Sequence, residues 1–228
     1  MEPRPAATIV LVRDAQGGPQ LLLVQRLANA VFGPGSWVFP GGVLEACDVE
    51  LKQLYPELAG RLAERMDLSP DAAVGYLCAA VRETLEETGI LVGSSSLAGT
   101  VRHDEIIHSL RTLLEQLTHL PYLDDVIYLS RWITPPGFPR RYDTRFFLAQ
   151  VGDRLEPVLS PLELAACRWI RPSDALERYA AGELVMMPPT VHTLKTLAGY
   201  ASVEMMLRDL RERPPESYLP ELPAELHP

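Results

Sequence analysis

The feature that most constrains this chain is the charged segment RETLEETGI, from Arg82 to Ile90. Its spacing predicts an α-helix over about 74–88. The apolar residues of this helix fall on one stripe that faces the core: Val74, Leu77, Cys78, Val81 and Leu85. On the same count Glu83, Glu86 and Glu87 share the opposite, solvent-side face, at spacings of three and four residues. Carboxylates this close repel one another unless a cation lies among them, and a hard divalent ion such as magnesium or manganese prefers oxygen ligands.

The FPGG motif upstream favours a metal site at this face over an ordinary solvated surface, which is what a Glu-rich helix face more often forms. Arg82 precedes Glu86 by four residues and can therefore fix the orientation of that carboxylate. Gly89 suits the left-handed conformation that ends a helix. Upstream, FPGG from Phe39 to Gly42 follows an apolar stretch, and paired glycines allow a backbone carbonyl to approach a ligand closely.

These motifs together resemble the Nudix box, whose pattern is G, five residues, E, seven residues, then REUxEExGU with U aliphatic. FPGG, an acidic residue six positions after its second glycine, and RETLEETGI follow that order. The chain departs from the pattern in three ways. Asp48 stands at the first Glu position, Thr84 stands at an aliphatic position, and about 26 extra residues precede the helix, which costs little once both ends of the insertion are anchored.

The resemblance implies a fold and a metal site. The implied fold class is α/β (α+β), a Nudix-like α/β/α sandwich with a mixed sheet, a helical insertion and C-terminal helices. The implied metal shell for Mg²⁺ or Mn²⁺ is the Gly41 carbonyl with Glu83, Glu86 and Glu87, oriented by Arg82. Glu86 or Glu87 is the expected general base by analogy with the family.

Some family members use instead a loop glutamate before a late strand. Glu163 in SPLEL matches that location, although a glutamate there is more often an ordinary loop acid.

Four arginines are candidates for substrate binding. Arg26 follows the second expected strand, where an arginine in the resembled family often meets the substrate; the alternative is a pair with a surface acid. Arg140, Arg141 and Arg145 form a concentrated basic cluster suited to phosphate oxygens. Asp143 lies between them and could instead make the cluster a structural ion-pair corner.

Composition indicates a globular protein with one main domain. The 228 residues are 47% hydrophobic and 22% charged, with a net charge of −9, so a nucleic acid or an anionic membrane is an unexpected partner. An acidic chain can still bind a phosphate substrate if a metal reverses the local charge. We expect a single domain over 1–212, with a helical insertion over about 47–70, and a Pro/Glu-rich tail over 213–228.

The cysteines and the first residues predict a reducing, cytoplasmic location. Cys47, Cys78 and Cys167 are odd in number and far apart, with no CxxC pair, so neither a disulfide framework nor a zinc site is expected. The opening MEPRP lacks the features of an export signal.

Apolar patterning places the remaining elements. Strands are expected at 6–12, 20–25, 37–39, 126–133 and 144–151 and in AACRWI, and helices at 104–117, 172–180, 189–200 and 202–211. The insertion is expected to be helical, with a break near Pro56. His103 and His108 are expected to be surface or capping residues. The tail is either disordered or an extended arm on the fold or on a second subunit.

The resemblance extends beyond the box. RPAATIVLVR, WVFPGGVLEACD, and RWITP followed by PRRYDTRFFL are similar to the branch of the Nudix family that contains a peroxisomal CoA diphosphatase, whose box is likewise interrupted. This implies a metal-dependent pyrophosphohydrolase that cleaves the diphosphate of a nucleoside diphosphate linked to another moiety, with CoA or acyl-CoA as the expected small-molecule substrate. An ADP-ribose or dinucleotide diphosphatase and a non-catalytic Nudix-fold binding module are the alternatives, and a homodimer is compatible with the sequence.

Overall fold

The computed structural model describes residues 2–50, 55–93 and 122–219 of the chain. Its centre is a mixed sheet with the strand order β3-β2-β1-β6-β5-β8, in which β4 also pairs with β1 and β7 with β2. β1 is parallel to β6, β5 is parallel to β8, and the other pairs are antiparallel. The strands are β1 (Arg4–Arg13), β2 (Gln20–Arg26), β3 (Trp37–Val38), β4 (Gly41–Val43), β5 (Ile127–Ile133), β6 (Tyr142–Gln150), β7 (Leu164–Ile170) and β8 (Glu216–Tyr218).

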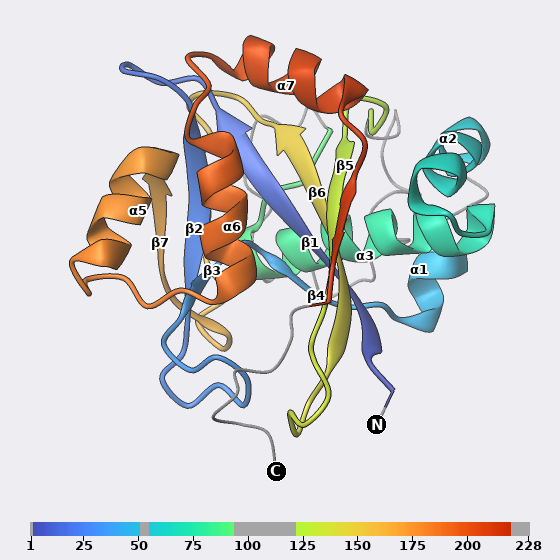
Figure 1. Ribbon diagram of the computed structural model, residues 1–228, viewed down its shortest axis with the longest axis horizontal. Coiled ribbons are helices and arrows are strands. Elements are labelled where there is room, and N and C mark those ends of the chain that lie inside the picture. The colour runs from blue at the N-terminus through green and yellow to red at the C-terminus, as the bar shows by residue number, and fades with distance from the viewer. Residues whose placement is uncertain (1, 51–54, 94–121, 220–228) are drawn as a thin grey trace.

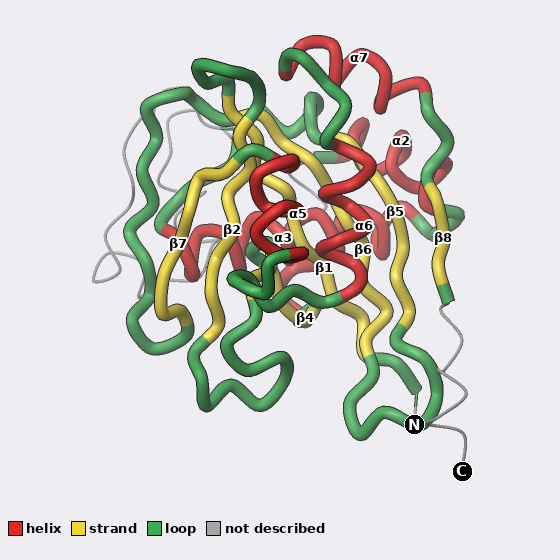
Figure 2. Tube along the Cα trace, turned by 60° about the vertical axis from the view of Figure 1, so that its left-hand side comes forward, coloured by secondary structure: helices red, strands yellow, loops and turns green. Residues whose placement is uncertain are grey.

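Helices cover both faces of this sheet (Figures 1 and 2). The first face carries α1 (Ala46–Glu50), α2 (Pro56–Met66) and α3 (Pro70–Thr88), and the second carries α5 (Pro172–Ala180), α6 (Pro188–Leu197) and α7 (Val203–Glu212). Each layer of helices closes its own hydrophobic core against the sheet. The α/β/α sandwich with a mixed sheet is therefore the fold class that the sequence predicts.

β1 shows why the sheet is buried on both sides. Ile9 and Leu11 belong to the core under α3, whereas Val10 and Val12 belong to the core under α6 and α7. Successive side chains of a strand point to opposite faces, so a strand covered on both sides reads as a continuous apolar run. The run AATIVLV has this character, and the predicted strand lies within β1.

α3 is the longest described helix. Ser69 caps it by accepting a hydrogen bond from the Ala72 amide, and Pro70 is its first residue. Gly89, at φ 68°, ends it in the left-handed conformation that the sequence predicts. The expectation of a fully solvent-facing carboxylate face is wrong for Glu87, which is 5% exposed, because that face of the helix packs against β4.

The insertion forms α1 and α2, and both helices pack on α3. Pro56, where a helix break was expected, is the first residue of α2. Arg65 of α2 donates hydrogen bonds to the carbonyl oxygens of Arg211 (2.6 Å) and Arg213 (2.9 Å) at the end of α7. Cations and donors suit a helix C-terminus, where carbonyl groups lack partners. The insertion is thus tied to the C-terminal part of the chain as well as to α3.

Part of the Pro/Glu-rich tail lies on the fold, which is one of the alternatives that its sequence leaves open. β8 pairs with β5, and the Tyr218 ring stacks on Trp132 with centroids 4.2 Å apart. Cys47, Cys78 and Cys167 are free thiols. None of the described helices is long and apolar enough to span a bilayer. The expected helix over 104–117, with His103 and His108, lies outside the described residues.

Candidate active site

Glu83 and Glu87 of α3 lie against the two glycines of β4. The Gly41 amide donates a hydrogen bond of 3.0 Å to Glu87 Oε2. A Cβ at Gly42 would overlap the Glu83 carboxylate, and a Cβ at Gly41, whose φ is 153°, would overlap the Ala7 carbonyl of β1. Only glycine therefore allows β4 to pair with β1 on one side and to receive the glutamates of α3 on the other.

Arg82 lies at the centre of the acidic cluster and uses all five of its N–H donors. Its Nη1 donates to Glu83 Oε1 at 3.0 Å and to Glu86 Oε2 at 3.1 Å. Its Nε and Nη2 donate to the two carboxylate oxygens of Asp48 at 2.9 and 3.0 Å, and Nη2 also donates to the Val43 carbonyl at 2.9 Å. One buried guanidinium thus holds two glutamates of α3 on one side and Asp48 on the other.

Asp48 is a site residue whose role the sequence does not reveal. It is completely buried, and its Oδ2 also accepts a hydrogen bond from the Glu45 amide at 2.8 Å, just before α1. One signal in the sequence could have paired Asp48 with Arg82. Asp48 stands at the acidic position of the box motif, and Arg82 is the arginine of RETLEETGI in the same motif.

Arg26 and Glu163 come from distant parts of the chain and border the same cluster. Arg26 ends β2 and pairs with Leu164 of β7, and the Leu27 amide donates to the Glu163 carbonyl at 3.4 Å. Glu163 raises the pKa of Glu87, and Arg26 lowers it, so both charges act on this carboxylate. The buried Nε of Arg26 has no hydrogen-bond partner among the described residues.

The glutamates of α3 are hard to ionise in this setting. Burial, opposed by Arg82 and reinforced by Glu86, raises the pKa of Glu83 to about 7. Burial likewise raises the pKa of Glu87 to about 8, although the hydrogen bond from Gly41 favours its charged form. The pKa of Glu86 is also raised, chiefly by burial. Such a cluster gains stability from a positive charge placed among its carboxylates.

The structure separates Arg145 from the other two arginines of the expected basic cluster, Arg140 and Arg141. Arg145 is buried, donates to the Tyr128 hydroxyl at 3.1 Å and lies over the Tyr76 ring. Asp143 pairs with Arg131 at 2.6 Å and lies 3.9 Å from Arg145, so this part forms the ion-pair corner that the sequence left as an alternative. Arg140 and Arg141 lie in the loop between β5 and β6. No hydrogen bond or ion pair among the described residues joins any of the three arginines to the glutamates of α3.

The donor set of the cluster fits a divalent cation. Glu83, Glu86, Glu87 and the Gly41 backbone offer the hard oxygen ligands that Mg²⁺ and Mn²⁺ prefer, and a cation among them would favour the charged forms that burial disfavours. Among the described residues, no three acidic, histidine or cysteine side chains are already arranged around one point as metal ligands. The carboxylates are instead held by Arg82 and by the Gly41 amide.

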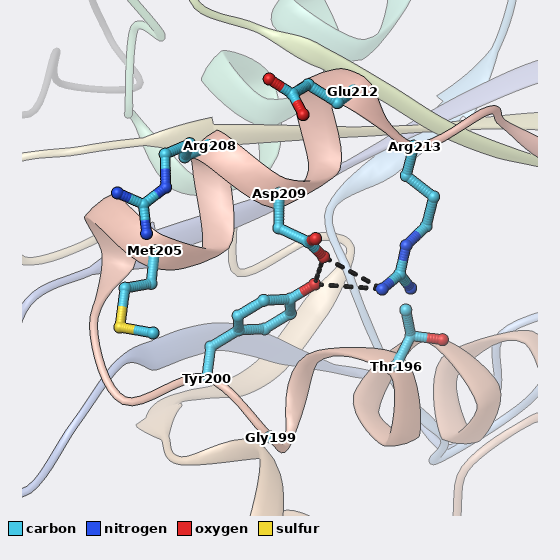
Figure 3. A pocket seen from close by; sticks show the side chains of 8 residues that line it. All are labelled: Thr196, Gly199, Tyr200, Met205, Arg208, Asp209, Glu212 and Arg213. Carbon is cyan, nitrogen blue, oxygen red and sulfur yellow. Dashed lines mark hydrogen bonds and ion pairs between the residues drawn. The ribbon is translucent and has the colours of Figure 1, made fainter.

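A separate cavity of about 510 Å³ opens between α6 and α7 (Figure 3). Within it, Arg213 and the Tyr200 hydroxyl both bond to the Asp209 carboxylate. The cavity lies beside the end of β1 that is farther from the glutamate cluster. There the Val203 amide of α7 donates a hydrogen bond to Asp14, the residue that follows β1. Its charges are balanced and exposed, so we assign no function to it. It is lined by Thr196, Gly199, Tyr200, Met205, Arg208, Asp209, Glu212 and Arg213.

A mixed sheet between two helical layers, with a glutamate-bearing helix laid across a Gly-Gly strand, defines a Nudix hydrolase fold. The sequence model of the NUDT19 Nudix domain matches residues 53–197, and the chain belongs to this family. The crystal structure of a NUDIX hydrolase from Alicyclobacillus acidocaldarius has a TM-score of 0.77 and 28% sequence identity, and the match covers 94% of this chain and 99% of that chain. The predicted family and fold class are thereby confirmed.

Two curated relatives are similar to this chain in sequence. Putative nudix hydrolase 7 of Caenorhabditis elegans is 28% identical over 201 residues, which cover 86% of this chain and 60% of the relative. The human acyl-coenzyme A diphosphatase NUDT19 is 29% identical over 240 residues, which cover 82% of this chain and 62% of the relative. The chain thus spans about 60% of the length of these relatives.

Proposed function

We propose that this protein is a metal-dependent pyrophosphohydrolase that cleaves the diphosphate of CoA or acyl-CoA. The observation that carries the proposal is the cluster of Glu83, Glu86 and Glu87 around Arg82, set against the Gly-Gly strand β4. The name of the human relative, an acyl-coenzyme A diphosphatase, supports the choice of substrate.

The proposed metal ligands are Glu83, Glu86, Glu87 and the Gly41 carbonyl, with Mg²⁺ or Mn²⁺ as the ion. A diphosphate resists attack because its oxygens are anionic, and a bound divalent ion supplies charge neutralisation and a hydroxide near neutral pH. Arg82 keeps Glu83 and Glu86 in place, and the buried Asp48 in turn fixes Arg82. Residues held in this way need little rearrangement when the substrate arrives.

The protein's own residues supply the remaining roles. Glu86 and Glu87 are the proposed candidates for the general base, and of these Glu86 is the more accessible, with 41% of its side chain exposed. Glu163, exposed on the loop before β7, is the alternative. The unpaired Nε of Arg26 supports a contact with a phosphate oxygen of the substrate, since guanidinium groups bind phosphate through charge-assisted hydrogen bonds.

The free thiols support the proposal of a reducing, cytoplasmic location. A homodimer stays a prediction from the sequence.

The test is a magnesium-dependent hydrolysis assay on CoA, acyl-CoAs, ADP-ribose, NADH, diadenosine polyphosphates and nucleoside triphosphates. Release of adenosine 3′,5′-bisphosphate and phosphopantetheine from CoA, abolished by EDTA, is the expected result. Cleavage of ADP-ribose or dinucleotides alone would keep the metal site and reject the CoA assignment. Tight binding of these compounds without any hydrolysis would favour a non-catalytic binding module.

A further inference from the structure

Three arginines gather at the start of β1, although the chain as a whole carries a net charge of −9. Arg4 is the partner of Tyr142 in the ladder between β1 and β6, and its amide donates to the Arg141 carbonyl at 2.9 Å. Arg140 precedes Arg141 in the same loop. The fold therefore adds Arg4, from the other end of the sequence, to an arginine pair between β5 and β6.

Two of these guanidinium groups are available to a ligand. Nε of Arg141 donates to the Thr134 carbonyl at 2.9 Å, which engages this side chain with its own hairpin. Arg4 and Arg140 are exposed, and neither side chain has a hydrogen bond or ion pair with any described residue. An acidic protein with two exposed arginines of this kind at one end of its sheet presents a local site for an anion.

Two aromatic rings lie at the same end of the sheet, and one of them belongs to Tyr142, the strand partner of Arg4. Phe32, in the loop between β2 and β3, meets Tyr142 edge to face, with ring centroids 5.1 Å apart. Tyr142 is held by two hydrogen bonds with Thr134, from the Thr134 amide to its carbonyl (2.9 Å) and from its own amide to Thr134 Oγ1 (3.1 Å). Both rings are half-buried. A fixed ring that keeps part of its surface open can stack with a planar base.

This cluster and the glutamates of α3 are connected through β1. Ala7 of β1 pairs with Gly42, the residue against which Glu83 lies, and Arg4 is three residues earlier on the same strand. At about 3.3 Å per residue the separation along the strand is on the order of 10 Å. Figures 1 and 2 place the β2–β3 and β5–β6 loops at this same end of the sheet. By the alternation of β1 the Arg4 side chain starts on the sheet face opposite to Glu83, so a nucleotide with its diphosphate at the glutamates would reach Arg4 past this end of the sheet.

We propose that Arg4, Arg140 and the Phe32–Tyr142 pair form the subsite for the nucleoside end of the substrate. Arg4 and Arg140 bind a phosphomonoester on the ribose, and the ring pair contacts the base. This inference rests on the proposed function and makes it narrower. It assigns to the site a nucleotide that carries a ribose phosphate in addition to its diphosphate, as CoA does and dephospho-CoA, ADP-ribose and NADH do not.

The test compares kcat/KM for CoA and for dephospho-CoA, which differ only in the ribose phosphate. The wild-type protein should prefer CoA by about tenfold or more, since two charge-assisted contacts depend on that phosphate. In the double variant Arg4→Ala/Arg140→Ala this preference should fall to near one. Arg208→Ala is the matched control, because Arg208 is an exposed arginine in the cavity of Figure 3, and it should retain the preference. Phe32→Leu should raise KM for both substrates alike.

Each result bears on the subsite separately from the proposed function. Equal kcat/KM of the wild-type protein for the two substrates would overturn the inference and leave the diphosphatase assignment intact. A preference that survives in the double variant would also overturn it. If neither substrate is hydrolysed, the proposed function fails, and the subsite is tested by calorimetric binding of adenosine 3′,5′-bisphosphate and AMP. Tighter binding of the bisphosphate by the wild-type protein, lost in the double variant, would support the subsite. Equal binding of the two nucleotides would refute it.

Discussion

Asp48 and Arg82 form a buried, two-point ion pair, with Nε–Oδ1 and Nη2–Oδ2 distances of 2.9 and 3.0 Å. The pair joins the segment at α1 to the glutamate-bearing face of α3. The same guanidinium holds Glu83 and Glu86 with its remaining nitrogen. The geometry of the proposed metal ligands Glu83 and Glu86 therefore depends on Asp48, which has no hydrogen bond to either glutamate among the described residues.

Replacing Asp48 with asparagine should destabilise the protein and reduce turnover. The change leaves Arg82 buried without its main counter-charge, and breaking a buried ion pair costs about 3 kcal/mol or more. We expect Tm to fall by about 6 °C or more and turnover to fall about tenfold, because Glu83 and Glu86 lose a fixed partner. Asp67→Asn is the control, since Asp67 is an exposed residue at φ 53°, a conformation that asparagine tolerates. A Tm for Asp48→Asn equal to that of the control would contradict the account.

Alanine at the two glycines of β4 should have different effects. At Gly42 the new Cβ meets only the flexible end of Glu83, so we expect a loss of turnover of about 10-fold to 100-fold with little change in stability. At Gly41 it meets the Ala7 backbone in a conformation that favours glycine, so we expect a destabilisation of about 1–3 kcal/mol. Thermal melts and initial rates measure both. Gly60→Ala is the control: its new Cβ lies in open space on α2, and it should slightly stabilise the protein. Equal effects of Gly41→Ala and Gly42→Ala on stability and turnover would contradict the different roles assigned to the two glycines.

The stability of the metal-free protein should fall as the pH rises from about 5 to 8. Glu83 and Glu87 have pKa values of about 7 and 8 in the folded protein and an ordinary value of 4.5, so the folded state retains protons that the unfolded state releases. In EDTA, Glu87→Gln should melt close to the wild type at pH 5 and about 3 °C or more above it at pH 8. A difference in Tm that is the same at both pH values would show that Glu87 is not held in this way.

The sequence predicts the features that depend on local periodicity. The helix carrying RETLEETGI follows from the 3.6-residue repeat of its apolar positions, and β1 follows from its continuous apolar run. The contact of Arg82 with Glu86 also follows, because residues four apart on a helix are neighbours. The fold class was predicted differently, from the resemblance of the box motif to a known family, and the structure confirms it.

The features that the sequence misses depend on contacts between distant segments. Asp48 and Arg82 are 34 positions apart with the insertion between them, and the burial of Glu87 depends on where β4 lies. The separation of Arg141 from Arg145 depends on where β6 begins: the strand was expected from Thr144 and starts at Tyr142, with Arg141 in the loop before it and Arg145 inside the strand, buried. β8, in a segment rich in proline, exists through its pairing with β5.

The most direct test of the central claim is the magnesium-dependent rate of CoA hydrolysis by Glu86→Gln. Glu86 is a proposed metal ligand, yet its side chain is 41% exposed and the apolar faces of α3 do not depend on it. The account predicts a fall in kcat of about a thousandfold or more, while circular dichroism and Tm stay close to wild type and the exposed control Glu204→Gln keeps full activity. A Glu86→Gln protein that folds normally and hydrolyses CoA at the wild-type rate would contradict it.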